Sequence, residues 1–230
     1  MFKLLKEILF PNDVKCIICD NEITEKYSIC NECLNKLKLI NGQRCPICLD
    51  KVKTDGYCAD CLKKKPFYTK LFCVYVYDSP IKELILKFKS GKNQFLREYF
   101  ARIAVDTVPK EIFEKCTLIT FVPCSDEKIA IRGYDQAEAI AKAVSEKTGI
   151  PYKKTIVRLN GNKTAKLNKS KRLESVKDRY IFCENVFGET VLIIDDVCTT
   201  SATLRYCSEQ LQIAGAKEVF CFTVARTDKH

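Results

Sequence analysis

The sequence predicts an α/β fold in which a mainly parallel sheet with flanking helices follows a small N-terminal metal-binding domain. Two observations predict it. Four CxxC pairs lie within residues 1–66, whereas after residue 66 short apolar runs alternate with segments of helical periodicity. Strands that alternate with helices are typical of a parallel sheet covered on both faces. A length of 230 residues suffices for one such domain and a small appendage, so we expect domains at 1–66 and 67–230.

The first ten residues, MFKLLKEILF, place Phe2, Leu5, Ile8 and Leu9 on one helical face. This pattern predicts a short N-terminal helix packed on the body of the protein, and an interfacial membrane helix is the alternative. Charged residues interrupt the apolar ones, so the segment does not resemble an export signal. No run reaches the roughly 20 apolar residues of a membrane helix. We therefore expect a cytoplasmic protein without a membrane span.

The cysteine pairs of residues 1–66 have the spacing of zinc knuckles. A CxxC turn directs two thiolates at one point, and two such turns complete a tetrahedral four-thiolate site. The chain has one histidine, His230 at the terminus, so the sites are expected to be all-sulfur. The loops between paired knuckles carry too few apolar residues to form a core without metal. We predict two structural Zn²⁺ sites with the ligands Cys16, Cys19, Cys30, Cys33, Cys45, Cys48, Cys58 and Cys61.

Other arrangements of these cysteines are open. Redox-active CxxC pairs and a disulfide framework would use the same residues. The chain is large for a disulfide scaffold, however, and an odd count of 15 cysteines cannot pair completely. Within the zinc interpretation, the knuckles form sites in sequence order or in a cross-braced order. The seven isolated cysteines are expected to be small buried hydrophobes.

After residue 66 each element is predicted from its apolar periodicity. Apolar runs predict strands over 71–77, 117–123, 189–196 and 218–225. A helical period predicts helices over 81–89, 94–105, 135–149 and 201–215. Pro123 ends the second strand. Gly149 and Gly215 end two of the helices, because glycine readily adopts the left-handed conformation that commonly follows a helix.

The stretch VLIIDDVCTTSATL, residues 191–204, carries the densest group of candidate site residues. Ligands of open α/β sheets bind outside the carboxyl ends of the strands, where this strand brings Asp195 and Asp196. The helix that begins near Ala202 presents free N–H groups that suit a phosphate. The carboxylates suit sugar hydroxyls, or water on a divalent metal. The stretch therefore predicts a ribose 5-phosphate site, with plain helix capping as the alternative.

This stretch resembles the phosphoribosyl pyrophosphate (PRPP) motif of type I phosphoribosyltransferases, which has an apolar strand, two acidic residues and a Thr-Thr-Gly-x-Thr loop. Ser201 stands where glycine is usual. Two further segments are similar to the ComF family: YVYDSPIKELILKFKSGKN, matched at Tyr77, Lys87 and Phe88, and the Arg-Gly-Tyr-Asp-Gln segment 132–136. With the cysteine knuckles in front, the resemblance covers nearly the whole chain. It implies a type I phosphoribosyltransferase-like sheet joined to a zinc-binding domain.

The resemblance also implies the residues of the site. PRPP, with Mg²⁺ carried mainly by its diphosphate, would be bound by Asp195, Asp196, Val197, Cys198, Thr199, Thr200, Ser201, Ala202 and Thr203, and on the diphosphate side by Cys124, Ser125 and Asp126. The catalytic candidates are Asp195, Asp196 and Arg132. Displacement at the anomeric carbon needs charge neutralisation on the leaving diphosphate more than a strong base. No segment indicates the acceptor.

Residues 153–179 hold ten lysines and arginines against Glu174 and Asp178. A solvated loop is the ordinary explanation of such a run. Beside a diphosphate site it also suits a mobile lid or a track for a nucleic-acid backbone. Arg158 and Arg172 match the arginine-rich loop of the ComF family. The candidate nucleic-acid contacts are Lys166, Lys169, Lys171 and Arg172.

Two functional hypotheses follow. A net charge of +10 favours phosphate-bearing partners or an anionic surface, and the ComF resemblance implies competence and DNA uptake. The first hypothesis is a PRPP-binding protein that handles single-stranded DNA together with partners in the DNA-uptake machinery. The second is an active phosphoribosyltransferase that transfers ribose 5-phosphate to a base or nucleotide-related acceptor. Candidates for stacking on bases are Tyr27, Tyr57, Phe67 and Tyr68.

Overall fold

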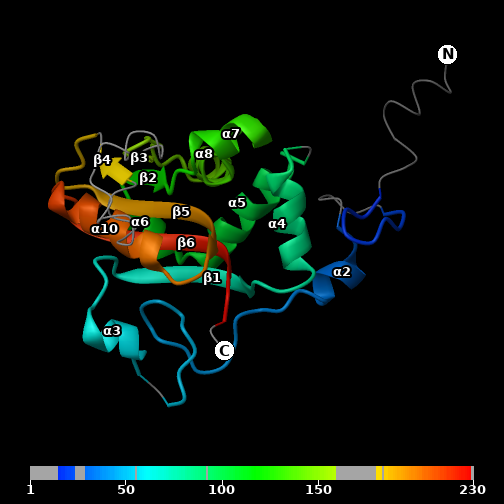
Figure 1. Ribbon diagram of the computed structural model, residues 1–230, viewed down its shortest axis with the longest axis horizontal. Helices are drawn as coiled ribbons and strands as arrows, with labels where there is room; N and C mark the ends of the chain where they lie inside the picture. Colours follow the sequence, from blue (N-terminus) through cyan, green and yellow to red (C-terminus); the bar gives the residue numbers. More distant parts are fainter. Residues whose placement is uncertain are drawn as a thin grey trace, which may run out of the picture.

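A four-stranded parallel sheet forms the centre of the protein. The computed structural model describes residues 15–23, 29–54, 56–91, 93–158, 180–182 and 184–228. The strand order is β1-β6-β5-β2, and each neighbouring pair is parallel (Figure 1). The strands are β1 (Lys70–Val76), β2 (Leu118–Phe121), β5 (Thr190–Cys198) and β6 (Glu218–Arg226). Every residue of β2 and nearly every residue of β6 is buried, as expected for strands of a parallel sheet covered on both faces.

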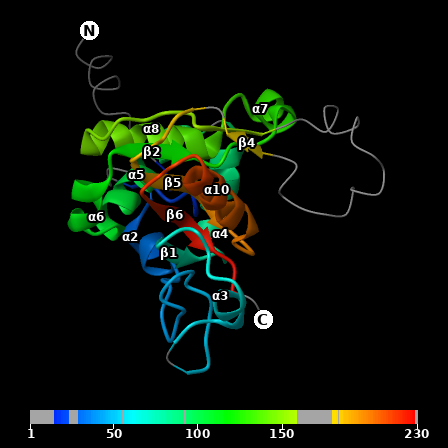
Figure 2. The same ribbon diagram turned by 90° about the vertical axis from the view of Figure 1, so that its left-hand side faces the viewer.

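Helices cover both faces of this sheet (Figure 2). One apolar core joins the sheet to α4 (Ile81–Lys89), α5 (Leu96–Thr107) and α8 (Gln136–Thr148). The core on the opposite face contains α10 (Ala202–Ile213) and a small antiparallel sheet of β3 (Ile156–Arg158) and β4 (Tyr180–Phe182). Two short helices complete this part, α6 (Lys110–Lys115) and α7 (Asp126–Arg132). The predicted α/β class is confirmed.

Each strand and helix predicted after residue 66 is present, and its ends differ by two residues at most. β5 continues to Cys198 because it keeps pairing with β6 as far as Arg226. The two short helices α6 and α7 were not predicted, since six or seven residues offer less than two turns of periodicity. As a result Asp126, expected in a loop, is the first residue of α7.

The N-terminal region lies on the β1 side of the sheet, with its helices α2 (Asn31–Asn35) and α3 (Ala59–Lys63) (Figure 1). Its backbone pairs with β1: the Ile40 N–H donates to the Val74 carbonyl at 2.7 Å, and the Val76 N–H donates to the Lys38 carbonyl at 2.9 Å. This pairing covers part of a strand edge that would otherwise be open. The domain boundary between residues 66 and 67 stays a prediction.

Some expectations lie outside the described residues. The predicted N-terminal helix with Phe2, Leu5, Ile8 and Leu9 is one, and the basic contacts between residues 166 and 172 are another. Within the described part of the chain, no helix has both the length and the apolar character needed to cross a membrane.

Candidate functional site

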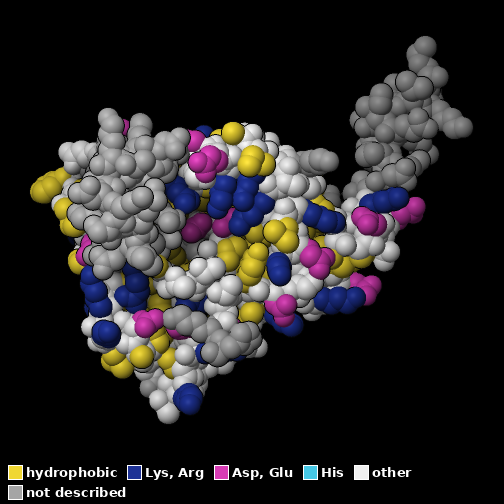
Figure 3. Space-filling model, viewed as in Figure 1, with side chains coloured by type: hydrophobic (Ala, Val, Ile, Leu, Met, Phe, Trp, Pro, Cys, Tyr) yellow, Lys and Arg dark blue, Asp and Glu magenta, His cyan; other side chains and the backbone are white. Residues whose placement is uncertain are grey.

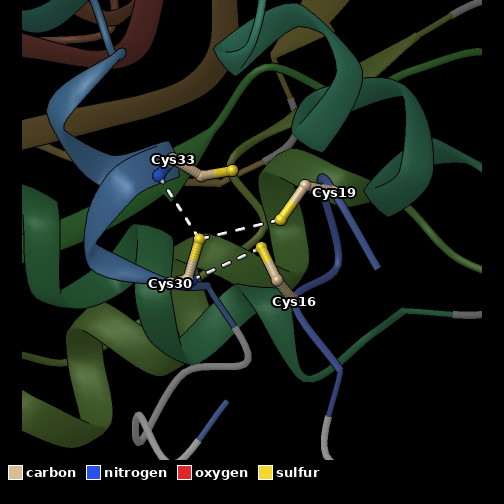
Figure 4. A group of neighbouring side chains, drawn as sticks. All are labelled: Cys16, Cys19, Cys30 and Cys33. Carbon is tan, nitrogen blue, oxygen red and sulfur yellow. Dashed lines mark hydrogen bonds between the residues drawn. The ribbon is translucent and has the colours of Figure 1, made fainter. Parts of the chain in front are cut away.

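Two groups of four cysteines converge in the N-terminal region. The four sulfur atoms within each group lie within 4.8 Å of one another, and those of the first group face a common centre (Figure 4). The groups are Cys16, Cys19, Cys30 and Cys33, and Cys45, Cys48, Cys58 and Cys61. The Cys19 and Cys30 sulfurs are 3.7 Å apart and those of Cys48 and Cys58 are 3.5 Å apart. These values approach the ~3.8 Å edge of a tetrahedron with zinc–sulfur bonds of about 2.3 Å. The pairing follows sequence order, and the residues fit two structural zinc ions.

Backbone N–H groups support thiolates in both groups. Cys16 Sγ accepts from the N–H groups of Cys30 at 3.4 Å and Ile18 at 3.5 Å. Burial raises the pKa of the Cys16 thiol, but neighbouring backbone N–H groups lower it to about 6 overall. The pKa of Cys45 falls to about 7 for the same combination of reasons. A lowered pKa favours the thiolate form that binds zinc. In the same groups, burial and neighbouring cysteines raise the pKa of Cys33, Cys48 and Cys61.

The isolated cysteines are mostly buried, as predicted. Of those that the structure describes, five are buried and Cys124 is partly buried; the five are Cys73, Cys116, Cys198, Cys207 and Cys221. Cys183 lies outside the described residues.

The acidic pair lies at the carboxyl end of β5. The Asp196 carboxylate forms an ion pair with Lys89 Nζ at 2.8 Å, and Asp195 Oδ1 accepts from the Asp196 N–H at 2.8 Å. Loss of solvent around Asp195 and the neighbouring charge of Asp196 raise the pKa of the Asp195 carboxyl well above its usual range. Two carboxyl groups and an ammonium are thus held together at the position where ligands of α/β sheets bind.

A cavity of about 170 Å³ opens beside the acidic pair. Four cations line it, and Figure 3 shows basic side chains gathered beside acidic ones over the carboxyl end of β5. The cations are Lys89, Lys128, Arg132 and Arg158. Six predicted site residues also line the cavity: Cys124, Arg132, Asp195, Asp196, Val197 and Thr203. Residues 198–202, Ser125 and Asp126 do not line it. The site therefore combines carboxylates for hydroxyl groups or metal with cations for phosphate.

The hydroxyl loop connects β5 to α10. Thr199 and Thr200 are exposed, whereas Ser201 is buried and adopts a left-handed conformation with φ 61°. Only glycine adopts this conformation without strain, which explains why glycine is usual at this position of the motif. The Ser201 side chain is directed into the protein, where its Oγ accepts from Arg226 Nη1 at 2.9 Å. Serine thus takes the conformation of the glycine while its hydroxyl is held by a buried partner.

The Arg-Gly-Tyr-Asp-Gln segment 132–136 organises the side of the cavity formed by α7 and the loop after β2. Asp135 caps α8, and its carboxylate also accepts from the Cys124 N–H at 2.7 Å. Arg132 donates to Gln136 Oε1 at 2.6 Å. The Tyr134 hydroxyl donates to the Phe88 carbonyl, one residue before Lys89. One short segment therefore orients the loop after β2, a cavity arginine and the end of α4.

Gly91 allows α4 to end close to this segment. It has φ +82°, and a Cβ at this position would overlap the carbonyl oxygen of Arg132. A side chain here would separate the two backbones, so glycine brings Lys89 and Arg132 to the same cavity. Lys89 and Lys128 were missed by sequence reasoning, which included Asp135 only as part of the matched segment 132–136. The available signal for Lys89 was its position directly after Lys87 and Phe88, which match the ComF family. Lys87 does not line the cavity and instead donates to the Ile17 carbonyl.

A larger cavity of about 850 Å³ lies between the N-terminal region and the ends of β1 and β6. Its charged residues pair with one another. Arg44 and Lys51 both form ion pairs with Asp228, and Lys38 pairs with Asp78 at 2.5 Å. The smaller cavity is therefore the better candidate for an anionic ligand.

Two of the proposed stacking aromatics are accessible. Tyr57 is 53% exposed and Phe67 is 36% exposed, but Tyr68 is fully buried and is wrong as a stacking candidate. Tyr27 lies outside the described residues.

These features define a class of protein: an α/β protein whose parallel sheet carries an acidic pair and a hydroxyl loop at its carboxyl edge and follows two four-cysteine zinc-binding sites. Residues 5–62 match the double zinc ribbon domain family. Over most of its length the chain is also similar to competence proteins, which confirms the resemblance to the ComF family.

The chain is 26% identical to competence protein ComFC of Bacillus subtilis, covering 92% of this chain and 95% of that protein. It is 23% identical to ComFC of Streptococcus pneumoniae, covering 93% and 100%. The DNA utilization protein YhgH of Escherichia coli is 23% identical, covering 87% and 91%.

Similar solved structures include the allosteric regulatory enzyme of purine biosynthesis, with a TM-score of 0.39, 22% identity and coverage of 59% of this chain and 25% of that one. They also include the purine phosphoribosyltransferase of Pyrococcus horikoshii, with a TM-score of 0.34, 21% identity and coverage of 59% and 84%.

Proposed function

We propose that this protein binds PRPP with Mg²⁺ at the cavity beside Asp195 and Asp196, and that it handles single-stranded DNA during DNA uptake. One observation carries the PRPP part: the acidic pair of β5 and four cations from α4, α7 and β3 converge on one cavity at the carboxyl edge of the sheet. A ligand with vicinal hydroxyls and several phosphates matches both halves of this arrangement.

Each group of residues in the site has a proposed contact with one part of PRPP. Asp195 and Asp196 accept from the ribose hydroxyls, and the N–H groups at the start of α10 bind the 5-phosphate. Lys128, Arg132 and the loop at Cys124 face the diphosphate. Carboxylate and diphosphate oxygens are the ligands that Mg²⁺ prefers, and Mg²⁺ would neutralise part of the diphosphate charge.

Lys89 has a place in this proposal as well. Its ammonium, 2.8 Å from the Asp196 carboxylate, balances the acidic pair before the ligand binds. When ribose hydroxyls occupy the carboxylates, the ammonium is free to turn toward a phosphate. Ligand binding then exchanges one charge-assisted contact for others without leaving a buried charge unpaired.

PRPP with Mg²⁺ is expected to raise the melting temperature of the wild-type protein, because a ligand that binds only the native state stabilises it. At 100 times its dissociation constant, the added stability is about 2.7 kcal/mol. Calorimetric titration and thermal melting measure this, with ribose 5-phosphate and pyrophosphate as partial ligands. Absence of heat and of a thermal shift at millimolar PRPP would overturn the proposed site.

The DNA part of the proposal is supported by the net charge of +10 and the cation run of residues 153–179. It is also supported by the names of the relatives, which refer to competence and DNA utilization. Ten clustered cations exceed what one diphosphate requires. Proteins of the DNA-uptake machinery are the partners that this function implies, and the cytoplasm is the compartment in which we place it.

An active phosphoribosyltransferase is the second candidate. The four cations around the cavity favour it, because neutralising a departing diphosphate is the main catalytic requirement of such a transfer. The acceptor would be a base or a nucleotide-related group.

Single-stranded DNA binding is expected to fall steeply with salt, and changing Lys166, Lys169, Lys171 and Arg172 to glutamine should lower the affinity and the salt slope together. Each phosphate contact on a single strand contributes about 0.7 to the logarithmic slope, so four lost contacts lower it by about 3. Fluorescence anisotropy across a salt series measures both quantities. The control changes Lys110, Lys115, Lys142 and Lys147, none of which lines the cavity. Salt-insensitive or absent DNA binding, with base-dependent pyrophosphate release, would favour the enzyme instead.

A further inference from the structure

Arg226, the last residue of β6, carries a fully buried guanidinium between the second cysteine group and the hydroxyl loop. Its Nη1 donates to Ser201 Oγ at 2.9 Å and to Cys198 Sγ at 3.1 Å. Its Nη2 forms an ion pair with Asp50 at 3.2 Å. Asp50 is itself buried and follows Cys48 by two residues. Burying a guanidinium costs free energy unless its charge is paired. The position of Arg226 therefore depends on its ion pair with Asp50, which joins two segments distant in the sequence.

Arg205 makes a second link between the same two parts. It lies in the first turn of α10, where its N–H donates to the Ser201 carbonyl at 2.9 Å. Its guanidinium reaches the other way, with Nη2 donating to Cys61 Sγ at 3.1 Å and Nη1 donating to the Lys64 carbonyl at 2.7 Å. Cys61 is a ligand of the second zinc site. The hydrogen bond from Arg205 to the Cys61 sulfur orients the Arg205 side chain only while Cys61 keeps its position in the zinc site.

The hydroxyl loop between these links is strained and needs support. Ser201 holds a left-handed conformation that only its surroundings can maintain. Thr227, next to Arg226, makes two further hydrogen bonds to the loop. Its N–H donates to the Cys198 carbonyl at 3.0 Å, and its hydroxyl donates to the Thr199 carbonyl at 3.3 Å. The loop is therefore held by side chains whose other partners belong to the zinc-binding region.

We propose that the second zinc site is a positioning support for the hydroxyl loop, with Arg226 and Arg205 as the positioning residues that connect them. Zinc would fix Cys61 and the turn that carries Asp50. Asp50 pairs with the Arg226 guanidinium, which donates to Ser201. Cys61 accepts from the Arg205 guanidinium, and Arg205 belongs to the first turn of α10. PRPP affinity then depends on an intact second zinc site. This inference rests on the proposed PRPP binding.

Two variants test the links while keeping all cysteine ligands. Asp50→Asn removes the charge that holds Arg226, and Arg205→Gln removes the bond to Cys61. Each is expected to lower PRPP affinity about five- to tenfold, a usual size for coupling between sites, with two zinc ions retained. Arg44→Gln is the matched control, because Arg44 is almost fully buried and ties the same region to Asp228 without contacting the loop.

Affinity is measured by calorimetry, zinc by metal analysis, and stability by thermal melting. Equal losses of PRPP affinity in all three variants would show that any weakening of the contact between the N-terminal region and the sheet lowers the affinity, and would overturn the proposal. Unchanged affinity in both Asp50→Asn and Arg205→Gln would overturn it as well. If Asp50→Asn loses zinc or fails to fold, Arg205→Gln carries the test, since its side chain is only partly buried.

Reciprocity gives a second readout. If zinc at the second site raises PRPP affinity, PRPP must raise zinc affinity by the same factor. Competition with a chromophoric chelator is expected to show tighter zinc retention with PRPP in the wild type, and a smaller effect in Arg205→Gln. An equal effect in both proteins would contradict the link through Arg205.

Amide hydrogen exchange separates this inference from the proposed function. Without any ligand, residues 198–203 are expected to exchange faster in Asp50→Asn and Arg205→Gln than in the wild type or Arg44→Gln. Failure of the wild type to bind PRPP would overturn the proposed function but leave this measurement valid. Unchanged exchange of the loop would overturn the support itself.

Discussion

Replacing Cys45 by serine is expected to reduce the zinc content from two ions per chain to one and to unfold the second zinc ribbon. A four-thiolate site supplies folding free energy directly, with apparent zinc-binding free energies of about 10 kcal/mol or more. The loops around this site have little apolar surface with which to compensate. Metal analysis of protein purified without chelators measures the zinc content, and hydrogen exchange measures which segments open.

The same variant tests the domain boundary that we propose between residues 66 and 67. The backbone partners of β5 and β6 lie within 67–230, so these strands are expected to stay protected. Protection at Leu71 should fall, because its N–H donates to the Ile47 carbonyl of the ribbon at 2.8 Å. Simultaneous loss of protection in β5 and β6 would instead show one cooperative unit.

Cys116→Ser is the matched control for the zinc prediction. Cys116 is buried, and burial raises the pKa of its thiol to about 12, but it belongs to neither cysteine group. Two zinc ions should remain, with a loss of stability of about 1 to 3 kcal/mol for placing a hydroxyl in an apolar site. Wild-type protein free of zinc, with the eight cysteines in disulfides, would contradict the metal assignment.

Replacing Asp196 by asparagine is expected to weaken PRPP binding about 10- to 100-fold. Asparagine keeps the shape but removes the charge that pairs with Lys89 and that accepts from the ligand, and a hydrogen bond to a charged group contributes about 1.5 to 3 kcal/mol. Asp195→Asn should act in the same direction. Calorimetric titration in the presence of Mg²⁺ measures the change.

Asp106→Asn serves as the control for the acidic pair. Asp106 forms an exposed ion pair with Arg102 on α5, and the side chain of Asp106 is 66% exposed. Exposed pairs of this kind contribute little, so its PRPP affinity and melting temperature should match the wild type. Unchanged affinity in both Asp195→Asn and Asp196→Asn would place the ligand elsewhere.

Several parts of the site were predictable because their signals are local. CxxC spacing brings two thiols together within one turn, which is why the eight zinc ligands were identified without a structure. Asp195 and Asp196 directly follow an apolar run, so their place at the carboxyl end of a strand follows from the pattern alone. Asp135 and Gly149, at the two ends of α8, are residues that cap helices for local reasons.

Other parts had no local signal. Lys89 belongs to the site because the Tyr134 hydroxyl holds the Phe88 carbonyl and because Gly91 lets α4 approach Arg132. These contacts join segments about 40 residues apart, and helical periodicity says only that Lys89 ends an amphipathic helix. The order of the zinc sites was likewise open, since both pairings use the same residues.

The sequence by itself determined the class of fold, the zinc ligands and the strand that carries the acidic pair, because periodicity and short spacings act within a few residues. Tertiary structure alone decided which cations join that pair, and that Arg226 and Arg205 connect the second zinc site to the hydroxyl loop. The physical reason is that a buried charge is stable only where the fold brings it a partner. The partner of Arg226 at Asp50 lies on a ribbon at the opposite end of the chain, beyond the reach of any local pattern.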